Sequence, residues 1–261
     1  MDKNIFYLDL GHGGKDPGAI GNNLVEKTEN LRKGLKFKKR LEEHEIKVYV
    51  TRTTDKYISL TDRANYLNSK CSDSSLLMIS FHHNSFEDAQ GCETFRSIHN
   101  SKNSKVGQFC DKVLNEMNKL GFKNRGNKTR ESKKYPGQDY YTVIKKTKMK
   151  AVIFEAYFLS SKSDVELGKK KENEIVEALV KCVCWYYGIK YKPIKKPEQK
   201  PEHWADESYL YLKNNGIGIS DKLYNTPLYR ANAFSMLADM LKQLNTKIKE
   251  LEDEIELLKL K

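Results

Sequence analysis

The chain has 261 residues, of which 38% are apolar and 31% charged, with 15 glycines and 6 prolines. This composition excludes collagen-like, mucin-like and broadly disordered chains, and the length suffices for one large domain or a medium domain with an appendage. The formal net charge of +12 favours polyanionic partners such as nucleic acid, acidic lipid headgroups or anionic wall polymers, without choosing among them.

The N-terminus runs from Met1 directly into a strand-like apolar segment at 5–8. It lacks the basic region, longer apolar segment and cleavage site of a signal peptide, so we expect the protein to be made and folded in the cytoplasm. The longest apolar segments, 76–81 and 151–159, are far shorter than the roughly 20 residues that cross a bilayer. We therefore expect no membrane insertion.

From residue 4 to Gly188, short apolar segments alternate with longer amphipathic ones, which is typical of an α/β domain. Segments 76–81 and 152–154 are continuously apolar, as central strands covered by helices on both faces are. The expected strands are Ile5–Leu10, Lys47–Thr51, Leu76–Phe81, Glu93–Arg96 and Val152–Tyr157, and the expected helices are Glu26–His44, Ser59–Ser69, Lys102–Leu120 and Asp164–Tyr187.

A domain boundary is expected after Gly188, because residues 189–202 are rich in proline and lysine and favour an extended connector. We therefore predict a catalytic domain at 1–188, a linker at 189–202 and a small helical region at 203–261. Residues 203–236 weakly resemble half of an S-layer-homology-type wall-binding repeat, which suggests wall targeting as a hypothesis.

The last 25 residues, 237–261, carry a heptad pattern, because apolar residues recur at alternating steps of four and three. β-Branched residues at a and leucine at d favour parallel two-stranded coiled coils, and Lys247 at g would face Glu252 at e of a partner. We predict a homodimer through this helix; the alternative is an amphipathic helix that packs on its own domain. The pattern consists of Leu237, Leu241, Leu244, Ile248, Leu251, Ile255 and Leu258.

The five cysteines are an odd number, which suits buried or free thiols better than a disulfide framework. Cys182 and Cys184 form a Cys-x-Cys pair within an apolar segment, and no second pair accompanies them. We therefore expect both to pack in the core rather than to bind a metal.

Two polar features stand at the N-terminal end of the domain. His12 lies in a glycine loop, 11–14, directly after the first strand, where ligands of open α/β sheets gather. It is either a metal ligand or an incidental histidine. Glu26 begins the first helix, where an acidic residue is favoured by the helix dipole without any further role, and Glu29 competes with it for a functional role.

Two more polar features close or interrupt apolar strands. His82 and His83 follow the strand 76–81, and one of them could simply form a hydrogen bond at the strand end. Because His12 and His82 both follow strands of one sheet, convergence of the two is favoured. Glu155 lies within a central apolar strand, where a carboxylate is costly unless it is paired, protonated or close to a cation. The alternative for Glu155 is a structural salt bridge.

Hydrolytic zinc sites use three protein ligands, often two histidines and one carboxylate, and leave the fourth position for water. His12, Glu26 and His82 supply such a set. Zinc would lower the pKa of a bound water to about 7 and polarise a substrate carbonyl. Glu155 would then accept the proton of that water and deliver it to the leaving amine.

In this order, the motifs of residues 4–188 resemble those of the zinc-dependent N-acetylmuramoyl-L-alanine amidases of bacteria and their phages. The resemblance implies a mixed, mostly parallel sheet flanked by helices, Zn²⁺ held by His12, Glu26 and His82, and catalysis by Glu155. It selects Glu26 over Glu29. The motifs are Gly-His-Gly-Gly-Lys-Asp-Pro-Gly-Ala (11–19), Glu-Lys-x-x-Asn-Leu (26–31), Thr-Arg-Thr-Thr-Asp (51–55), Ser-Leu-x-x-Arg-Ala-Asn (59–65), Ser-Phe-His-His-Asn-Ser (80–85), Gly-x-Glu-Thr (91–94) and Ala-Val-Ile-Phe-Glu (151–155).

The sequence departs from the family pattern at three positions, none of them an expected ligand. The family usually has a small residue in place of His83, a proline in place of Lys150 and a small residue in place of Tyr157. His83 is either a substrate or outer-shell contact or a solvated side chain, and we expect the solvated one.

The resemblance implies a substrate, peptidoglycan, and a reaction, cleavage of the amide between the lactyl group of N-acetylmuramic acid and L-alanine. Without a signal peptide, the chain resembles an endolysin of a phage or prophage that waits in the cytoplasm for a membrane pore, or an amidase that lyses a mother cell. The alternatives are a zinc peptidase that cuts within the stem peptide and a non-catalytic basic binder of wall polymer or nucleic acid. No nucleic-acid-binding signature accompanies the charge, so we expect no nucleic-acid partner.

Overall fold

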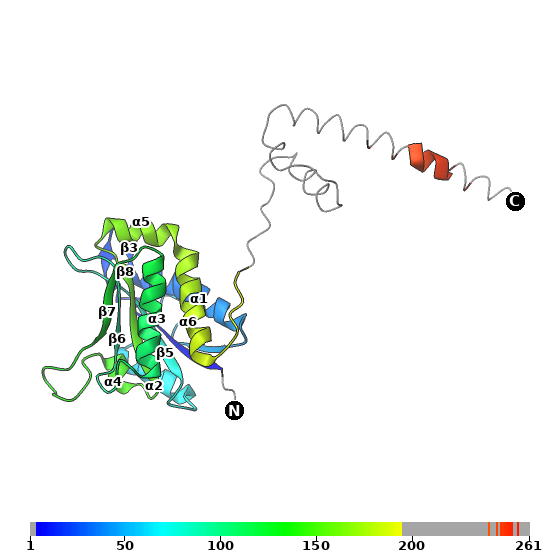
Figure 1. Cartoon of the computed structure of the whole chain (residues 1–261). Coiled ribbons are helices and arrows are strands. Elements are labelled where there is room, and N and C mark those ends of the chain that lie inside the picture. The colour runs from blue at the N-terminus through cyan, green and yellow to red at the C-terminus, as the bar shows by residue number, and fades with distance from the viewer. Residues whose placement is uncertain (1–3, 195–239, 241–243, 245, 253–254, 256–261) are drawn as a thin grey trace. The chain divides into compact units, whose positions relative to one another are not determined.

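The computed structural model describes residues 4–194, 240, 244, 246–252 and 255 (Figure 1). The chain divides into two compact units, Met1–Pro193 and Ile194–Lys261, and the division falls within the expected linker. The first unit holds every strand that the structure describes, and the described residues of the second unit from 240 onward are helical.

A six-stranded sheet with the order β4-β1-β5-β8-β6-β7 forms the centre of the first unit. β4, β1, β5 and β8 are parallel, whereas β6 is antiparallel to β8 and β7 is parallel to β6. This is the mixed, mostly parallel sheet that was predicted. A separate hairpin of β2 and β3 precedes the first helix. The strands are β1 Ile5–Leu10, β2 Ile20–Gly21, β3 Leu24–Val25, β4 Lys47–Val50, β5 Leu77–Asn84, β6 Cys92–Arg96, β7 Asn124–Thr129 and β8 Lys150–Phe158.

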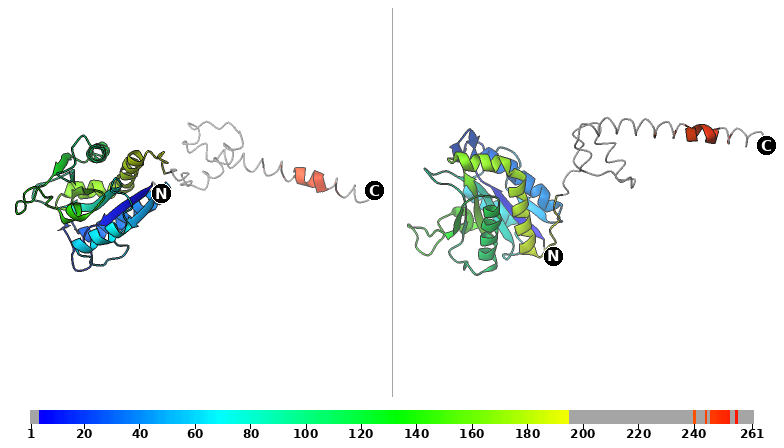
Figure 2. Two further views of the ribbon diagram at one scale, coloured as in Figure 1. Left: turned by 90° about the horizontal axis from the view of Figure 1, so that it is seen from below. Right: turned by 45° about the horizontal axis from the view of Figure 1, so that its top comes forward.

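Helices cover both faces of the sheet. α6 packs against both α1 and α3 on one face, and α2 packs against α4 on the other, as the views in Figures 1 and 2 show. The segment 164–187, which was predicted as one helix, forms two helices that meet at Lys171. The helices are α1 Glu26–Glu42, α2 Leu60–Lys70, α3 Lys105–Lys119, α4 Thr142–Lys146, α5 Lys162–Lys170 and α6 Glu172–Tyr187.

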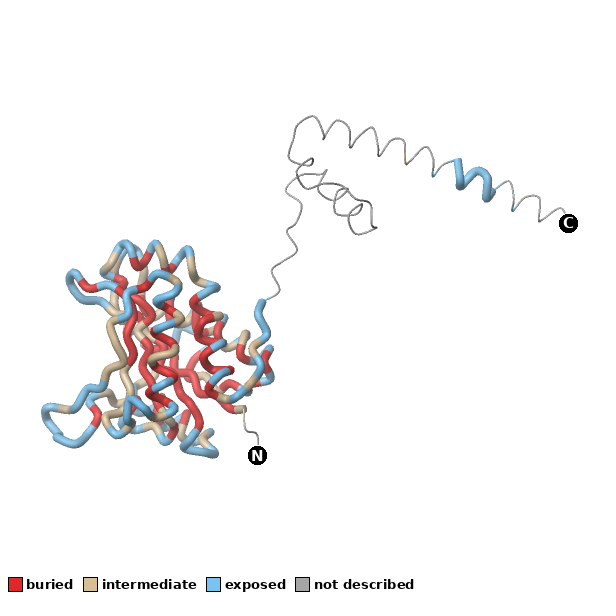
Figure 3. Tube along the Cα trace, in the orientation of Figure 1, coloured by how far each residue is buried: buried red, intermediate tan, exposed pale blue. Residues whose placement is uncertain are grey.

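The strands alternate their side chains between two apolar clusters. In β1, Phe6 and Leu8 enter the cluster under α1, α3 and α6, whereas Ile5 and Tyr7 enter the smaller cluster under α2 and α4. All six residues of β1, including Asp9, are buried, as in a central strand that is covered on both faces. Figure 3 shows that the buried segments follow the strands and the inner sides of the helices.

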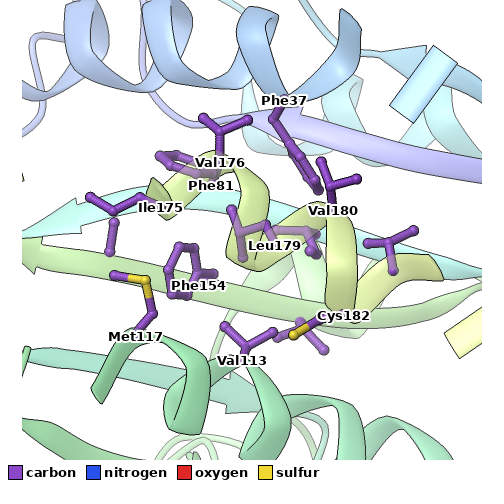
Figure 4. Packing of buried hydrophobic residues seen from close by; sticks show 14 of the residues in the cluster. Phe37, Phe81, Val113, Met117, Phe154, Ile175, Val176, Leu179, Val180 and Cys182 are labelled. Carbon is purple, nitrogen blue, oxygen red and sulfur yellow. The ribbon is translucent and has the colours of Figure 1, made fainter. Parts of the chain in front are cut away.

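The larger cluster fixes the helices that cover it. In Figure 4, Phe37 of α1 and Leu179 of α6 share one apolar cluster with Phe81 and Phe154 of the sheet. The rings of Phe81 and Phe154 meet edge to face with 5.6 Å between their centroids. Cys182 and Cys184 are buried in the same cluster, so the predicted core role of the Cys-x-Cys pair is confirmed.

Four elements were not predicted from the sequence: the short strands β2 and β3 of the hairpin, the strand β7 and the helix α4. β7 has the sequence Asn-Arg-Gly-Asn-Lys-Thr, which contains no apolar residue, and it forms the edge of the sheet. α4 is only five residues long. β7 pairs with β6 and packs against α3, so tertiary contacts rather than local hydrophobic patterning form this strand.

The described part of the second unit contains four positions of the heptad pattern. Leu244, Ile248, Leu251 and Ile255 are all exposed. The other heptad positions and segment 203–236 lie outside the described residues, so the coiled coil and the wall-binding repeat stay predictions. Within the part of the chain that the structure describes, no helix has the length and apolar character of a membrane span.

Candidate active site

The loop that follows β1 places His12 in a left-handed backbone conformation, with φ of 61°. This conformation is strained for a residue with a side chain, so its surroundings must hold it. Two buried arginines do so. Arg52 donates hydrogen bonds to the carbonyls of Leu10 and Gly11, both at 2.9 Å, and Arg63 donates to the carbonyls of Leu10 and His12, both at 2.6 Å. Both arginines come from the motifs at 51–55 and 59–65.

The structure brings His12, Glu26 and His82 together from the β1 loop, the start of α1 and the end of β5. Nε2 of His12 lies 3.1 Å from Oε2 of Glu26, and Nδ1 of His82 lies 2.8 Å from Oε1 of Glu26. The three ligand atoms all lie within 4.8 Å of one another. Ligands on tetrahedral zinc, each about 2.0–2.1 Å from the ion, are about 3.3 Å apart. Two imidazoles and a carboxylate at these separations fit zinc.

Two motif glycines leave room for these side chains. A Cβ at Gly11 would lie 2.1 Å from Cε1 of His82, and a Cβ at Gly18 would lie 2.5 Å from Oε2 of Glu26. Gly18 also has φ of +67°, which side chains rarely adopt. The absence of a Cβ at Gly11 and Gly18 therefore lets the backbone pass close to His82 and Glu26, in addition to permitting the turn.

Polar groups lie close to the outer nitrogens of both histidines. Oδ2 of Asp16 lies 2.9 Å from Nδ1 of His12, and the Ser80 hydroxyl lies 3.1 Å from Nε2 of His82. Ser80 in turn donates to Asp9 at 2.7 Å. Partners of this kind orient metal-binding imidazoles, because one ring nitrogen is held while the other is directed at the metal. In this arrangement Nε2 of His12 and Nδ1 of His82 face Glu26.

Asn30 links the ligand cluster to His83. The Asn30 amide donates to Oε1 of Glu26 and to the carbonyl of Gly11, both at 3.2 Å, and its Oδ1 lies 2.7 Å from Nδ1 of His83. The backbone N–H of His83 also donates to Oε1 of Glu26, at 3.2 Å. His83 therefore contacts Glu26 directly through its backbone N–H and indirectly, through Asn30, with its side chain.

The expectation of a solvated His83 is wrong, because this side chain is only 2% exposed. Its ring meets the ring of Tyr157 edge to face, with 4.5 Å between the centroids. Burial is the largest of the effects that lower the pKa of His83, followed by the charge of Lys33. His83 and Tyr157, two of the three departures from the family pattern, therefore contact each other in the interior. They fill space that small residues would leave.

Glu26 sets the electrostatics of the cluster. Burial alone would lower the pKa of His82, but the hydrogen bond and the negative charge of Glu26 outweigh burial and raise this pKa to about 9. The two histidines hold the pKa of Glu26 well below its usual range despite its burial. Glu29 is not part of the cluster, because its carboxylate pairs with Arg32 and with buried Lys33.

Glu155 lies beside this cluster. Its cross-strand partners are His82 of β5 and Glu93 of β6, and directly paired residues carry their side chains on the same face, about 5 Å apart. Oε2 of Glu155 is buried and has no hydrogen-bond partner among the described residues. No ion pair of Glu155 forms within this part of the chain, so the structural salt bridge finds no support. Burial raises the pKa of Glu155 to about 7.

Sequence reasoning missed three residues of the site. Asn30 follows Glu26 by four residues, so helical periodicity alone places the two on one face. Asp16 follows His12 by four residues in the glycine-rich loop, which gave a weaker signal. Glu93 stands in the motif at 91–94, but its place beside Glu155 depends on the antiparallel pairing of β6 with β8, which the sequence did not predict.

The region that contains this site matches a known family. The sequence model of the N-acetylmuramoyl-L-alanine amidases matches residues 6–184, which include all four candidate site residues. The chain belongs to the N-acetylmuramoyl-L-alanine amidase family. Relatives agree: the endolysin of Bacillus phage SPP1 is 32% identical to this amidase over 225 residues, which are 82% of this chain and 78% of the phage protein.

Solved structures show the same fold. The catalytic domain of the amidase CwlV from Bacillus (Paenibacillus) polymyxa matches this amidase with a TM-score of 0.60 and 25% identity, covering 72% of this chain and 99% of that domain. An N-acetylmuramoyl-L-alanine amidase from Clostridium difficile 630 matches with a TM-score of 0.60 and 28% identity, covering 72% and 98%. The predicted family and its peptidoglycan amidase function are therefore confirmed.

Proposed function

We propose that this amidase cleaves the amide bond between the lactyl group of N-acetylmuramic acid and L-alanine with a zinc ion held by His12, Glu26 and His82. One observation carries the proposal: the three ligand atoms lie within 4.8 Å of one another, and the adjacent Glu155 has a buried carboxylate oxygen without a partner among the described residues. A carboxylate oxygen that is buried without a partner beside such a cluster supports a chemical role for Glu155.

A zinc ion bound there supplies a Lewis acid that lowers the pKa of water to about 7 and polarises the amide carbonyl. Glu155 accepts a proton from the attacking water as the oxygen bonds to the carbonyl carbon. It then delivers this proton to the amide nitrogen as the C–N bond breaks. The products are a lactyl carboxylate on muramic acid and a free amino group on L-alanine. A pKa of about 7 suits Glu155 to both transfers, since an acid–base group works best near the operating pH.

The test replaces Glu155 by glutamine, which keeps the shape of the side chain but cannot exchange the proton. We expect Glu155→Gln to keep stoichiometric zinc and to lose about 10²- to 10⁴-fold in turnover. Zinc content is measured by elemental analysis, and turnover by release of soluble fragments from purified walls. Glu166→Gln, at an exposed position of α5, is the matched control. Full activity of Glu155→Gln would remove this residue from the mechanism.

Mass spectrometry of the digested wall separates the amidase from the zinc peptidase. Amidase products carry a free amino group on L-alanine, whereas a peptidase leaves L-alanine joined to muramic acid. A third outcome, wall degradation that survives chelator in a protein without zinc, would contradict the metal mechanism.

We propose further that this amidase acts as an endolysin, reaching the wall from the cytoplasm through a membrane pore. The support is its similarity to a phage protein named endolysin over most of both chains. Expression of the amidase alone should leave cells intact, and co-expression with a pore-forming protein should lyse them. Lysis by the amidase alone at the same level would contradict the proposed route.

We also propose a homodimer through residues 237–261. Its support is the exposure of Leu244, Ile248, Leu251 and Ile255, which together form one face of the heptad pattern. A second copy of the same helix would cover this face, and Lys247 and Glu252 have complementary charges at its flanks. Sedimentation should give a dimeric mass for the full chain and a monomeric mass for a chain that ends before Leu237. Equal oligomeric states would contradict the dimer.

A further inference from the structure

On the side of Glu155 away from the zinc ligands, one buried carboxylate anchors two cations. Oε2 of Glu93 accepts hydrogen bonds from Nε of Arg125 at 2.9 Å and from Nζ of Lys128 at 2.5 Å, and its Oε1 accepts from the amide of Asn84 at 2.9 Å. The Glu93 side chain is only 5% exposed, whereas those of Arg125 and Lys128 are 29% and 37% exposed. The buried Glu93 carboxylate therefore fixes the two cations, which remain partly exposed to solvent.

The cluster of Glu93, Arg125 and Lys128 has more positive charge than Glu93 neutralises and more hydrogen-bond donors than Glu93 accepts from. One carboxylate balances one cation, so the three side chains together carry one net positive charge. Arg125 uses only Nε on Glu93, and its terminal nitrogens have no hydrogen-bond acceptor among the described residues. Its guanidinium lies over the ring of Phe158, 4.7 Å from the centroid, and this contact holds the orientation of the guanidinium plane. Fixed guanidinium and ammonium donors of this kind bind carboxylates.

The cluster is in line with the reacting groups. The register pairs His82 with Glu155 and Glu155 with Glu93, so a row of side chains crosses from β5 through β8 to β6 on one face. Arg125 and Lys128 lie on β7, the next strand. Neighbouring strands are about 4.8 Å apart, so β7 lies about 10 Å from β8.

We propose that Arg125 and Lys128 form a subsite that binds a carboxylate of the stem peptide, two or three residues beyond the scissile amide. This inference rests on the proposed function. An extended peptide advances about 3.3–3.6 Å per residue, so two or three residues cover the distance from Glu155 to the cations. The peptide rather than the glycan occupies the subsite, because the hydroxyl and acetamido groups of the glycan carry no charge and the peptide carries carboxylates.

The subsite gives the amidase a preference for charged stem peptides. A carboxylate would gain charge-assisted hydrogen bonds from Arg125 and Lys128, whereas a carboxamide at the same position would gain neither charge attraction nor acceptor strength. Because these contacts form with parts of the substrate that do not react, their loss should raise KM more than it lowers kcat.

The experiment compares two synthetic N-acetylmuramoyl peptides that differ only at the second and third residues, which carry free carboxylates in one and carboxamides in the other. The zinc-loaded full chain should cleave the carboxylate form with a kcat/KM about tenfold higher. The double variant Arg125→Gln/Lys128→Gln should cleave both at equal rates. The control Lys39→Gln/Lys148→Gln removes the same charge from exposed positions and should keep the preference. Lys128→Gln alone keeps the Arg125–Glu93 pair, and it should reduce the preference for the carboxylate peptide about threefold.

The outcomes separate this inference from the proposed function. Equal cleavage of both peptides by the unaltered chain, or an undiminished preference in the double variant or in Lys128→Gln, would overturn the subsite and leave the amidase mechanism intact. Failure of the zinc-loaded chain to cleave either peptide would overturn the mechanism itself. A general loss of charge attraction would show as an equal loss of preference in the control pair, and it too would overturn the subsite.

Discussion

Charged side chains lie on both halves of the sheet, but in different surroundings. In the parallel half, which consists of β4, β1, β5 and β8, the side chains of Arg63 and Asp9 are each 2% exposed, and both make several hydrogen bonds near His12 and His82. At the antiparallel edge, Arg125 and Lys128 share one buried carboxylate and remain partly exposed. Buried charges with all partners inside the protein fix geometry, whereas partly exposed charges with spare donors are available to a ligand.

The largest expected effect is in the parallel half. His82→Ala removes one of the three proposed zinc ligands, so we expect loss of zinc and a fall in turnover of at least about a thousandfold. His99→Ala, at an exposed position after β6, should keep both zinc and activity. Elemental analysis and wall lysis measure the two quantities. A His82→Ala protein with bound zinc and normal lysis would show that the cluster is not the metal site.

The second effect is on stability. Arg63→Ala leaves Asp9 buried without its cation and removes the donor that holds the His12 carbonyl. Removing one partner of a buried pair costs about 3–5 kcal/mol, and we expect this fall in the free energy of unfolding. Urea denaturation measures it. A loss of less than about 1 kcal/mol would mean that the parallel half tolerates the removal of a charge as well as β7, at the edge of the sheet, is expected to.

The third effect is on the pH dependence of the free energy of unfolding. Burial raises the pKa of Asp9, but Arg63 and Ser80 outweigh burial and the pKa in the folded protein is lowered. A group with a lowered folded pKa contributes stability above its unfolded pKa, about 3.9, and this contribution is lost as the pH falls below that value. Asp9→Asn should therefore reduce the slope of unfolding free energy against pH below about pH 4, by up to about 1.4 kcal/mol per pH unit. Parallel slopes for the two proteins would contradict this.

The smallest effect is expected at the edge. Lys128→Gln leaves Glu93 paired with Arg125 and removes a partly exposed charge, so the free energy of unfolding should change by less than about 1 kcal/mol. The same urea titration that is applied to Arg63→Ala gives the comparison. A loss of several kcal/mol would show that Lys128 has a structural role like that of Arg63, and the contrast between the two halves would disappear.

The zinc-ligand candidates were visible in the sequence because each stands where an element begins or ends. His12 and His82 follow or close apolar strands, and Glu26 begins a helix, so local patterning placed them at one end of the sheet. Glu155 was visible because a carboxylate interrupts an apolar strand. The resemblance to a family, rather than patterning, separated Glu26 from Glu29.

Local patterning determined the central strands and the long helices of this protein, because burial on both faces requires continuous apolar segments and amphipathic helices require a regular period. Only the tertiary structure decided the position of β7, the burial of His83 against Tyr157, and the placing of Glu93 with its two cations beside Glu155. Each of these depends on contacts between segments far apart in the chain, and such contacts are set by strand pairing and packing rather than by neighbouring residues.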